Sequence, residues 1–187
     1  ADQLVLDHVA RNGDHLISRT VAWANINSGS RNPDGLLRVL DELEAAFRPL
    51  PVTIERVQTG TSITVSSDGS VATDHFAPAL RITCRPEAPT QIVTTGHYDT
   101  VFDASSPFQR VIQRPDGALN GPGIADMKGG ISVMLGALEA FEAHPNKDSV
   151  GWTALLSPDE EIGSPGSAPL LAELGRQGHI GLTYEPA

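Results

Sequence analysis

The feature that most constrains the fold is an alternation of strand and helix patterns in the second half of the chain. Strands are predicted at 91–95, 151–156 and 180–184, and helices at 126–141 and 168–174. Strands joined through helices pair in parallel by right-handed crossovers, and such a sheet needs helices on both faces. We therefore expect an α/β domain, a three-layer sandwich in which a largely parallel mixed sheet is flanked by helices.

The first half has the elements that would complete such a sandwich. Apolar residues at helical spacing predict helices at 3–23 and 33–47, and Pro33 suits a first-turn position. Alternating or apolar runs predict strands at 52–57, 62–66 and 79–84. Turn residues at 68–70 and 114–117 predict hairpin or loop tips. We expect Trp23, Trp152 and the single Cys84 to lie in the core.

Composition excludes some partners. The formal charge of −10 argues against nucleic-acid binding, which depends on clustered Lys and Arg. No apolar run approaches the roughly 20 residues of a membrane span, so no membrane association is expected. The residues leave the cellular compartment open. An acidic chain is, however, compatible with bound cations.

Polar side chains follow directly on the predicted strands. His97 and Asp99 come after the strand at 91–95, Glu160 and Glu161 after that at 151–156, and Glu185 after that at 180–184. The crevice outside the carboxyl ends of the strands is where open α/β sheets build their sites. A glycine-rich loop at 121–126 adds Asp126 at the predicted start of a helix. We expect these groups to meet in one crevice.

Imidazole and carboxylates without thiolates form a ligand set for zinc, manganese or cobalt in a hydrolytic site. With two metals about 3.5–4 Å apart, a bridging Asp and a bridging water give a nucleophile at neutral pH. In the pair Glu160-Glu161, one carboxylate can then bind metal while the other takes the proton of the water.

Taken singly, each of these residues has a simpler interpretation. His97 alone would be a structural or surface histidine, and Asp126 alone a helix N-cap. Glu160 and Glu161 would be a solvated loop, and Glu185 a surface charge. Their coincidence at strand ends and a helix start favours the metal site.

The sequence resembles the zinc aminoacylase and glutamate carboxypeptidase family of two-metal peptidases. Four ordered motifs carry the resemblance, at 96–101, 121–130, 159–164 and 185–186. Within this family, residues 25–30 and the sequence of the 121–126 loop most resemble those of the bacterial glutamate carboxypeptidases. The resemblance runs over essentially the whole chain.

The resemblance implies a role for each residue. His97 and Glu185 would bind one zinc, Glu161 would bind the second, and Asp126 would bridge both. Asp99 would orient His97, fixing its tautomer. Glu160 would be the general base and later the proton donor to the leaving amine. The implied reaction is hydrolysis of an amide bond in a small peptide or an N-acyl amino acid.

Members of this family continue into a lid or dimerisation domain and a further stretch of the catalytic domain. We therefore expect residues 1–187 to be the N-terminal portion of a catalytic zinc-peptidase domain whose full-length protein is a homodimer through that lid. On this view three ligands serve one metal, and only Asp126 and Glu161 serve the other. The resemblance implies one more histidine ligand for this second metal, supplied by the further stretch of the catalytic domain. His179 precedes the last strand, so we do not assign it that role.

Other interpretations remain. The alternative class is a catalytically silent metal-binding fragment, and a related deacetylase or dipeptidase would share the same metal chemistry. A dinucleotide site is disfavoured because Asp126 stands where the G-x-G-x-x-G motif needs its third glycine, and no phosphate-binding P-loop motif or serine-hydrolase elbow is present.

Two further features of the predicted helix start have a structural interpretation. Lys128 could equally form an ion pair with a carboxylate or lie on the helix surface. Gly129 and Gly130, costly in a helix, indicate close packing against the metal loops.

Overall fold

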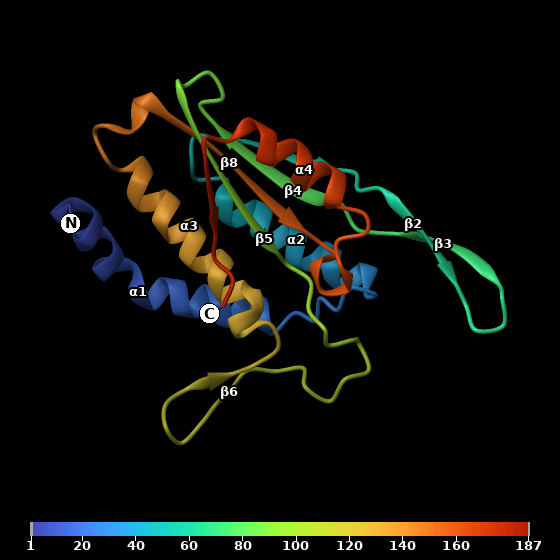
Figure 1. Cartoon of the computed structure of the whole chain (residues 1–187). Coiled ribbons are helices and arrows are strands. Elements are labelled where there is room, and N and C mark those ends of the chain that lie inside the picture. The colour runs from blue at the N-terminus through green and yellow to red at the C-terminus, as the bar shows by residue number, and fades with distance from the viewer. Residues whose placement is uncertain (1, 187) are drawn as a thin grey trace.

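A five-stranded mixed sheet forms the centre of the protein, described here for residues 2–186 of a computed structural model (Figure 1). The strand order is β1-β4-β8-β5-β9. Their bounds are β1 Thr53–Val57, β4 Ala79–Cys84, β5 Thr90–His97, β8 Val150–Ser157 and β9 Ile180–Thr183. Strands β8, β5 and β9 pair in parallel, whereas β4 is antiparallel to both of its neighbours. The expected mixed sheet is thus confirmed, with antiparallel pairing on the β1–β4 side.

The register of the parallel strands brings their carboxyl ends together. His97 at the end of β5 lies opposite Ser157 at the end of β8. On the other side Thr95 of β5 pairs with Thr183, the last residue of β9. The loops after all three strands therefore leave the sheet at one edge, where the sequence had placed its carboxylates.

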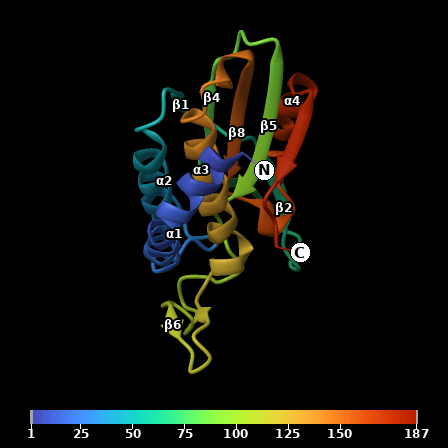
Figure 2. The same ribbon diagram turned by 90° about the vertical axis from the view of Figure 1, so that its left-hand side faces the viewer.

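Helices cover both faces of the sheet, as Figure 2 shows. On one face lie α1 (Gln3–Ala24), α2 (Pro33–Phe47) and α3 (Gly129–Glu142), and on the other lies α4 (Ala168–Gln177). The larger core lies under the three helices and includes both Trp23 and Trp152, with Cys84 buried beside them. A smaller cluster around Leu155 packs against α4. The core positions predicted for these three residues are confirmed.

Side-chain caps set the starts of the first two helices. The Asp2 carboxylate accepts a hydrogen bond from the backbone N–H of Leu4, and the Asn32 side chain accepts one from Gly35. Pro33 follows directly as the first residue of α2, because its fixed φ suits that position. No helix within residues 2–186 is long and apolar enough to cross a membrane.

Two hairpins extend from the body of the molecule (Figure 1). Strands β2 (Thr61–Val65) and β3 (Val71–His75) form the first, and β6 (Ile112–Gln113) and β7 (Leu119–Asn120) form the second. Their tips contain Gly69 and Gly117, both with positive φ. The turns predicted at 68–70 and 114–117 are confirmed.

The predicted helix start at Asp126 is wrong. The α3 helix begins at Gly129, after a kinked π-helical turn at Ile124–Lys128 in which Asp126 and Met127 have non-helical φ and ψ. Tertiary packing outweighs the helical periodicity here, because Met127 turns inward and is fully buried. Its sulfur accepts a hydrogen bond from the backbone N–H of His97 at 3.2 Å.

The two glycines at the start of α3 allow close backbone approach. A Cβ on Gly129 would lie 2.4 Å from the carbonyl oxygen of Ile124, and one on Gly130 would lie 2.2 Å from that of Tyr184. Gly130 therefore lets the segment after β9, which carries Glu185, run directly against α3. The predicted packing of these glycines is confirmed.

Replacing Gly130 by Ala should destabilise the fold by ~1–3 kcal/mol, because the added methyl group meets backbone that cannot move alone. Gly175, inside α4, is the matched control, since a Cβ there meets nothing within 4 Å. Gly175→Ala should stabilise by ~0.5–1 kcal/mol through helix propensity alone. Urea unfolding of both variants measures the difference, and equal effects would contradict the close approach.

Candidate metal centre

His97 is the centre of the cluster. It ends β5, and its side chain is only 1% exposed. Its Nε2 atom lies 3.0 Å from Asp126 Oδ1, 3.6 Å from Glu185 Oε2 and 3.7 Å from Glu160 Oε2. These three carboxylates are partly open to solvent, so the buried imidazole faces a crevice lined by acids.

Asp99 lies on the other side of the same ring and is fully buried. His97 Nδ1 is 3.2 Å from its Oδ1 atom and 3.1 Å from its backbone oxygen. The carboxylate also accepts hydrogen bonds from Ser30 Oγ at 2.6 Å and from the backbone N–H groups of Glu160 and Glu161, each at 3.2 Å. Asp99 is therefore placed to orient the ring and to hold the loop after β8.

The loop before α3 presents Asp126 to His97. Gly123 has a φ of +69°, and its carbonyl accepts a hydrogen bond from the backbone N–H of Lys128, which closes the turn. Asp126 does not cap α3, so the simpler interpretation of this residue is wrong. Its side chain points at the imidazole because the non-helical backbone at Asp126 and Met127 sends the two side chains to opposite sides.

Glu160 and Glu161 start a short 3₁₀ helix, Glu160–Ile162, directly after β8. The neighbouring Asp159 is fully buried and turns away from the cluster, since its Oδ2 accepts hydrogen bonds from the backbone N–H groups of Gly166 and Ser167. Sequence reasoning gave Asp159 no role. It fixes the turn that leads from the two glutamates into α4.

Ligand atoms of His97, Asp126 and Glu161 all lie within 4.8 Å of one another. Together with Glu185 and Glu160 at His97, the structure brings all the residues expected at the site into one crevice. One imidazole and several carboxylates match the nitrogen and oxygen donors that zinc, cobalt and manganese accept. The residues present therefore fit a divalent metal.

The charges of the cluster also favour a cation. Burial raises the pKa of Glu161, and the negative charge of Asp126 raises it further. Burial likewise raises the pKa of Glu185, with Asp126 and Glu160 adding to the effect. Within residues 2–186 no Lys or Arg forms an ion pair with these carboxylates. The charge of His97 opposes both of these shifts, but one imidazole faces several carboxylates, and such crowded acids are stabilised further by a bound positive ion.

Lys128 is buried, so the helix-surface alternative is wrong. Its Nζ atom donates a hydrogen bond to the backbone oxygen of Ile26 at 2.9 Å. Burial lowers the pKa of Lys128 to about 7, although the charge of Asp99 opposes this. The sequence did not predict that Lys128 is buried and bound to a backbone carbonyl, because a single Lys after an acid gives no signal of burial.

His179 takes no part in the cluster. Its Nδ1 accepts a hydrogen bond from the backbone N–H of Gln91 at 3.0 Å, at the opposite end of β5 from His97. His179 is therefore distant from the crevice that contains His97 and Asp126.

Comparisons with known proteins show the family of the chain. The profile of the family described as "Peptidase family M20/M25/M40" matches residues 93–185, which include every residue of the cluster. The chain belongs to this peptidase family. The resemblance drawn from the four motifs is thus confirmed.

Two relatives illustrate the match. Carboxypeptidase G2 of Pseudomonas sp. (strain RS-16) is 30% identical over 167 residues, which cover 87% of this chain and 36% of that protein. Succinyl-diaminopimelate desuccinylase of Hahella chejuensis is 38% identical over 78 residues, covering 37% of this chain and 19% of that one. The chain thus spans well under half the length of these relatives.

Solved structures share the fold. Human carnosine dipeptidase 1 superposes with a TM-score of 0.77 at 18% identity, over 98% of this chain and 41% of that one. The metallo-carboxypeptidase Sso-CP2 of Sulfolobus solfataricus gives a TM-score of 0.64 at 17% identity, over 90% and 37%. The three-layer architecture is therefore that of the family.

The metal-free protein should lose stability as the pH rises. Burial lowers the pKa of His97, but the hydrogen bond and charge of Asp99, with smaller effects of Glu185 and Asp126, raise it overall from 6.5 to about 9. Because the pKa of His97 is higher in the folded than in the unfolded chain, His97 contributes ~3 kcal/mol to the free energy of unfolding below about pH 6.5. This contribution is lost as the pH rises to about 9.

Urea unfolding of chelator-treated protein between these pH values measures the effect. His97→Gln is the control, and its free energy of unfolding should change little between these pH values. An NMR titration of His97 with a midpoint below 7 would contradict the described environment.

Proposed function

We propose that this chain provides the metal-binding and acid–base groups of a hydrolase that cleaves amide bonds in small peptides or N-acyl amino acids. The observation that carries the proposal is the convergence of Asp126, Glu160 and Glu185 on the Nε2 atom of the buried His97. Family membership supports it, as do the relatives named carboxypeptidase, desuccinylase and dipeptidase.

We assign the ligands as the family resemblance implies. His97 and Glu185 would hold one metal, Glu161 would hold a second, and Asp126 would serve both. The proposed metal is zinc, with cobalt or manganese compatible with the same donors. When bound, such ions polarise the scissile carbonyl and lower the pKa of water.

The remaining groups of the chain have distinct tasks. Glu160 is half-exposed at the crevice and takes no structural hydrogen bond through its side chain within the described residues. We propose that Glu160 accepts the proton of the attacking water and then donates it to the leaving amine. Asp99 keeps His97 Nδ1 protonated, which leaves Nε2 free to bind metal.

We also propose that residues 1–187 are the N-terminal portion of a catalytic domain and that the complete protein is a homodimer through a lid domain. The share of carboxypeptidase G2 that the chain covers, 36%, supports the first part. The family resemblance supports the second. If the chain lacks turnover but binds metal, the silent-fragment alternative holds for this polypeptide.

Glu160→Gln should leave the metal content unchanged and reduce amide hydrolysis by about 100-fold or more, because a general base typically contributes 10²–10⁴-fold. Elemental analysis and hydrolysis of an N-acyl amino acid by the complete protein measure the two effects. Glu42→Gln, an exposed change on α2, is the control. Retained turnover would remove Glu160 from the role of base.

Asp126→Ala should instead lose bound metal. The variant removes the carboxylate shared by both proposed ions, so the zinc content per chain should fall more than in Glu185→Gln. Elemental analysis after gel filtration measures this. A normal metal content would contradict the bridging assignment of Asp126.

A further inference from the structure

Arg31 lies in the loop between α1 and α2, one residue after the serine that binds Asp99. This loop is held firmly. Ser30 donates from its hydroxyl to Asp99, and its backbone N–H donates to the carbonyl of Thr100 at 3.2 Å. Asn32 N–H donates to the carbonyl of Gly29 at 2.8 Å. The backbone on both sides of Arg31 is thus fixed relative to His97.

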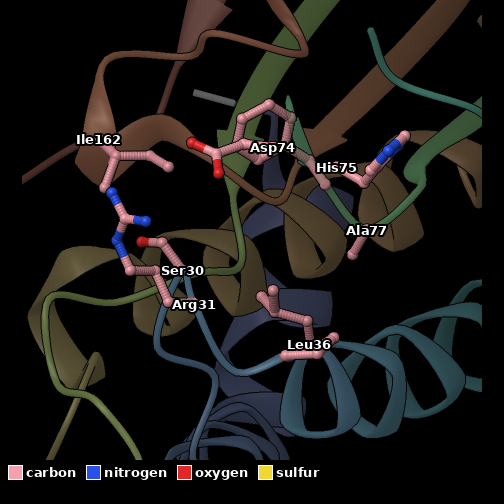
Figure 3. Close-up of a pocket in the computed structure, with 9 residues that line it drawn as sticks. Ser30, Arg31, Leu36, Asp74, His75, Ala77 and Ile162 are labelled. Atoms are coloured by element: carbon pink, nitrogen blue, oxygen red, sulfur yellow. The ribbon is translucent and has the colours of Figure 1, made fainter. Parts of the chain in front are cut away.

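The Arg31 side chain lies between two adjoining hollows. The first, of about 180 Å³, is also lined by Asp74, His75 and Ile162 (Figure 3). The second, of about 260 Å³, is lined by Glu161 of the candidate metal centre. Figure 3 shows the guanidinium reaching toward Ile162, the residue that follows Glu161. Arg31 therefore borders the crevice in which the proposed reaction would occur.

The guanidinium is exposed, and within residues 2–186 it makes no hydrogen bond or ion pair. Three acids line these hollows, Asp74 in the first and Asp103 and Glu161 in the second, and none of them pairs with Arg31 in the described part of the chain. Asp74 accepts a hydrogen bond from Thr64 Oγ1, and Asp103 accepts two from Ser105. By contrast, Arg56, Arg81 and Arg85 all pair with carboxylates. A free guanidinium beside an acidic catalytic crevice is available to a ligand.

We propose that Arg31, in the loop between α1 and α2, binds a carboxylate of the substrate and so positions the substrate at the crevice. A guanidinium offers parallel N–H donors that match a carboxylate in a bidentate pair. In a chain of net charge −10, it also gives an anionic substrate a local cation to approach. This inference rests on the proposed function, because the crevice at Glu161 defines where the substrate lies.

Binding to metal-free chain tests Arg31 without turnover. The probes are N-acetylglutamate and its diamide, in which both carboxylates are replaced by neutral amides. Chemical shifts of backbone amides are followed by NMR at constant ionic strength. We expect saturable shifts at Ser30, Arg31 and Ile162 with the acid and about tenfold weaker binding of the diamide.

Arg31→Gln should weaken binding of the acid about tenfold and remove the preference over the diamide, and Arg31→Lys should restore part of it. Arg38→Gln removes the same charge from an exposed site on α2 and should bind as the unaltered chain does. Thermal unfolding identifies a merely structural role, which would lower the melting temperature of Arg31→Gln without changing the preference.

The proposal is overturned if the unaltered chain shows no saturable binding, if Arg31→Gln keeps the preference for the acid, or if Arg38→Gln weakens binding equally. The metal-free measurement is independent of Glu160. A failure of amide hydrolysis would therefore contradict the proposed function alone, while equal binding of the acid and the diamide by the unaltered chain would contradict the role of Arg31 alone.

Discussion

The buried carboxylate of Asp99 is the interaction on which the rest of the site depends. An isolated charge inside a protein costs several kcal/mol, and it is tolerated only when paired and hydrogen-bonded. Asp99 meets this requirement by joining three separate segments: the ring of His97 after β5, Ser30 in the loop between the first two helices, and the backbone of Glu160 and Glu161 after β8. The same contacts that stabilise the charge therefore place an imidazole, two glutamates and the loop of Arg31 around one crevice.

The sheet and the glycines complete this arrangement. Parallel pairing of β5 with β8 and β9 brings three strand ends to one edge, and Gly130 lets the chain after β9 approach α3 closely enough to bring Glu185 to His97. The fully buried Met127 fills the space behind the histidine. The crevice is thus formed largely by backbone geometry, and the acidic side chains are left free to bind a cation.

Much of this could be predicted from the sequence because its signals are periodic or local. The bounds of α2 and β4 follow from apolar spacing, and the strand-end positions of His97, Glu160 and Glu185 follow from the elements before them. The start of α3 could not be predicted, since the burial of Met127 outweighs a helical pattern that includes it. Lys128, Asp159 and Arg31 also escaped prediction. Their environments depend on residues distant in the sequence, and single charged residues give no periodic signal.

Anomalous diffraction at the zinc edge from crystals of the zinc-loaded chain is the most direct test of the metal centre. We expect a peak within about 2.0–2.2 Å of His97 Nε2 and of a carboxylate oxygen of Asp126, with nitrogen and oxygen ligands only. A second, weaker peak near Glu161 at about 3.5–4 Å from the first would support the two-metal assignment. Zinc bound only elsewhere on the chain, or no zinc beside His97, would contradict the conclusion that this cluster is a metal site.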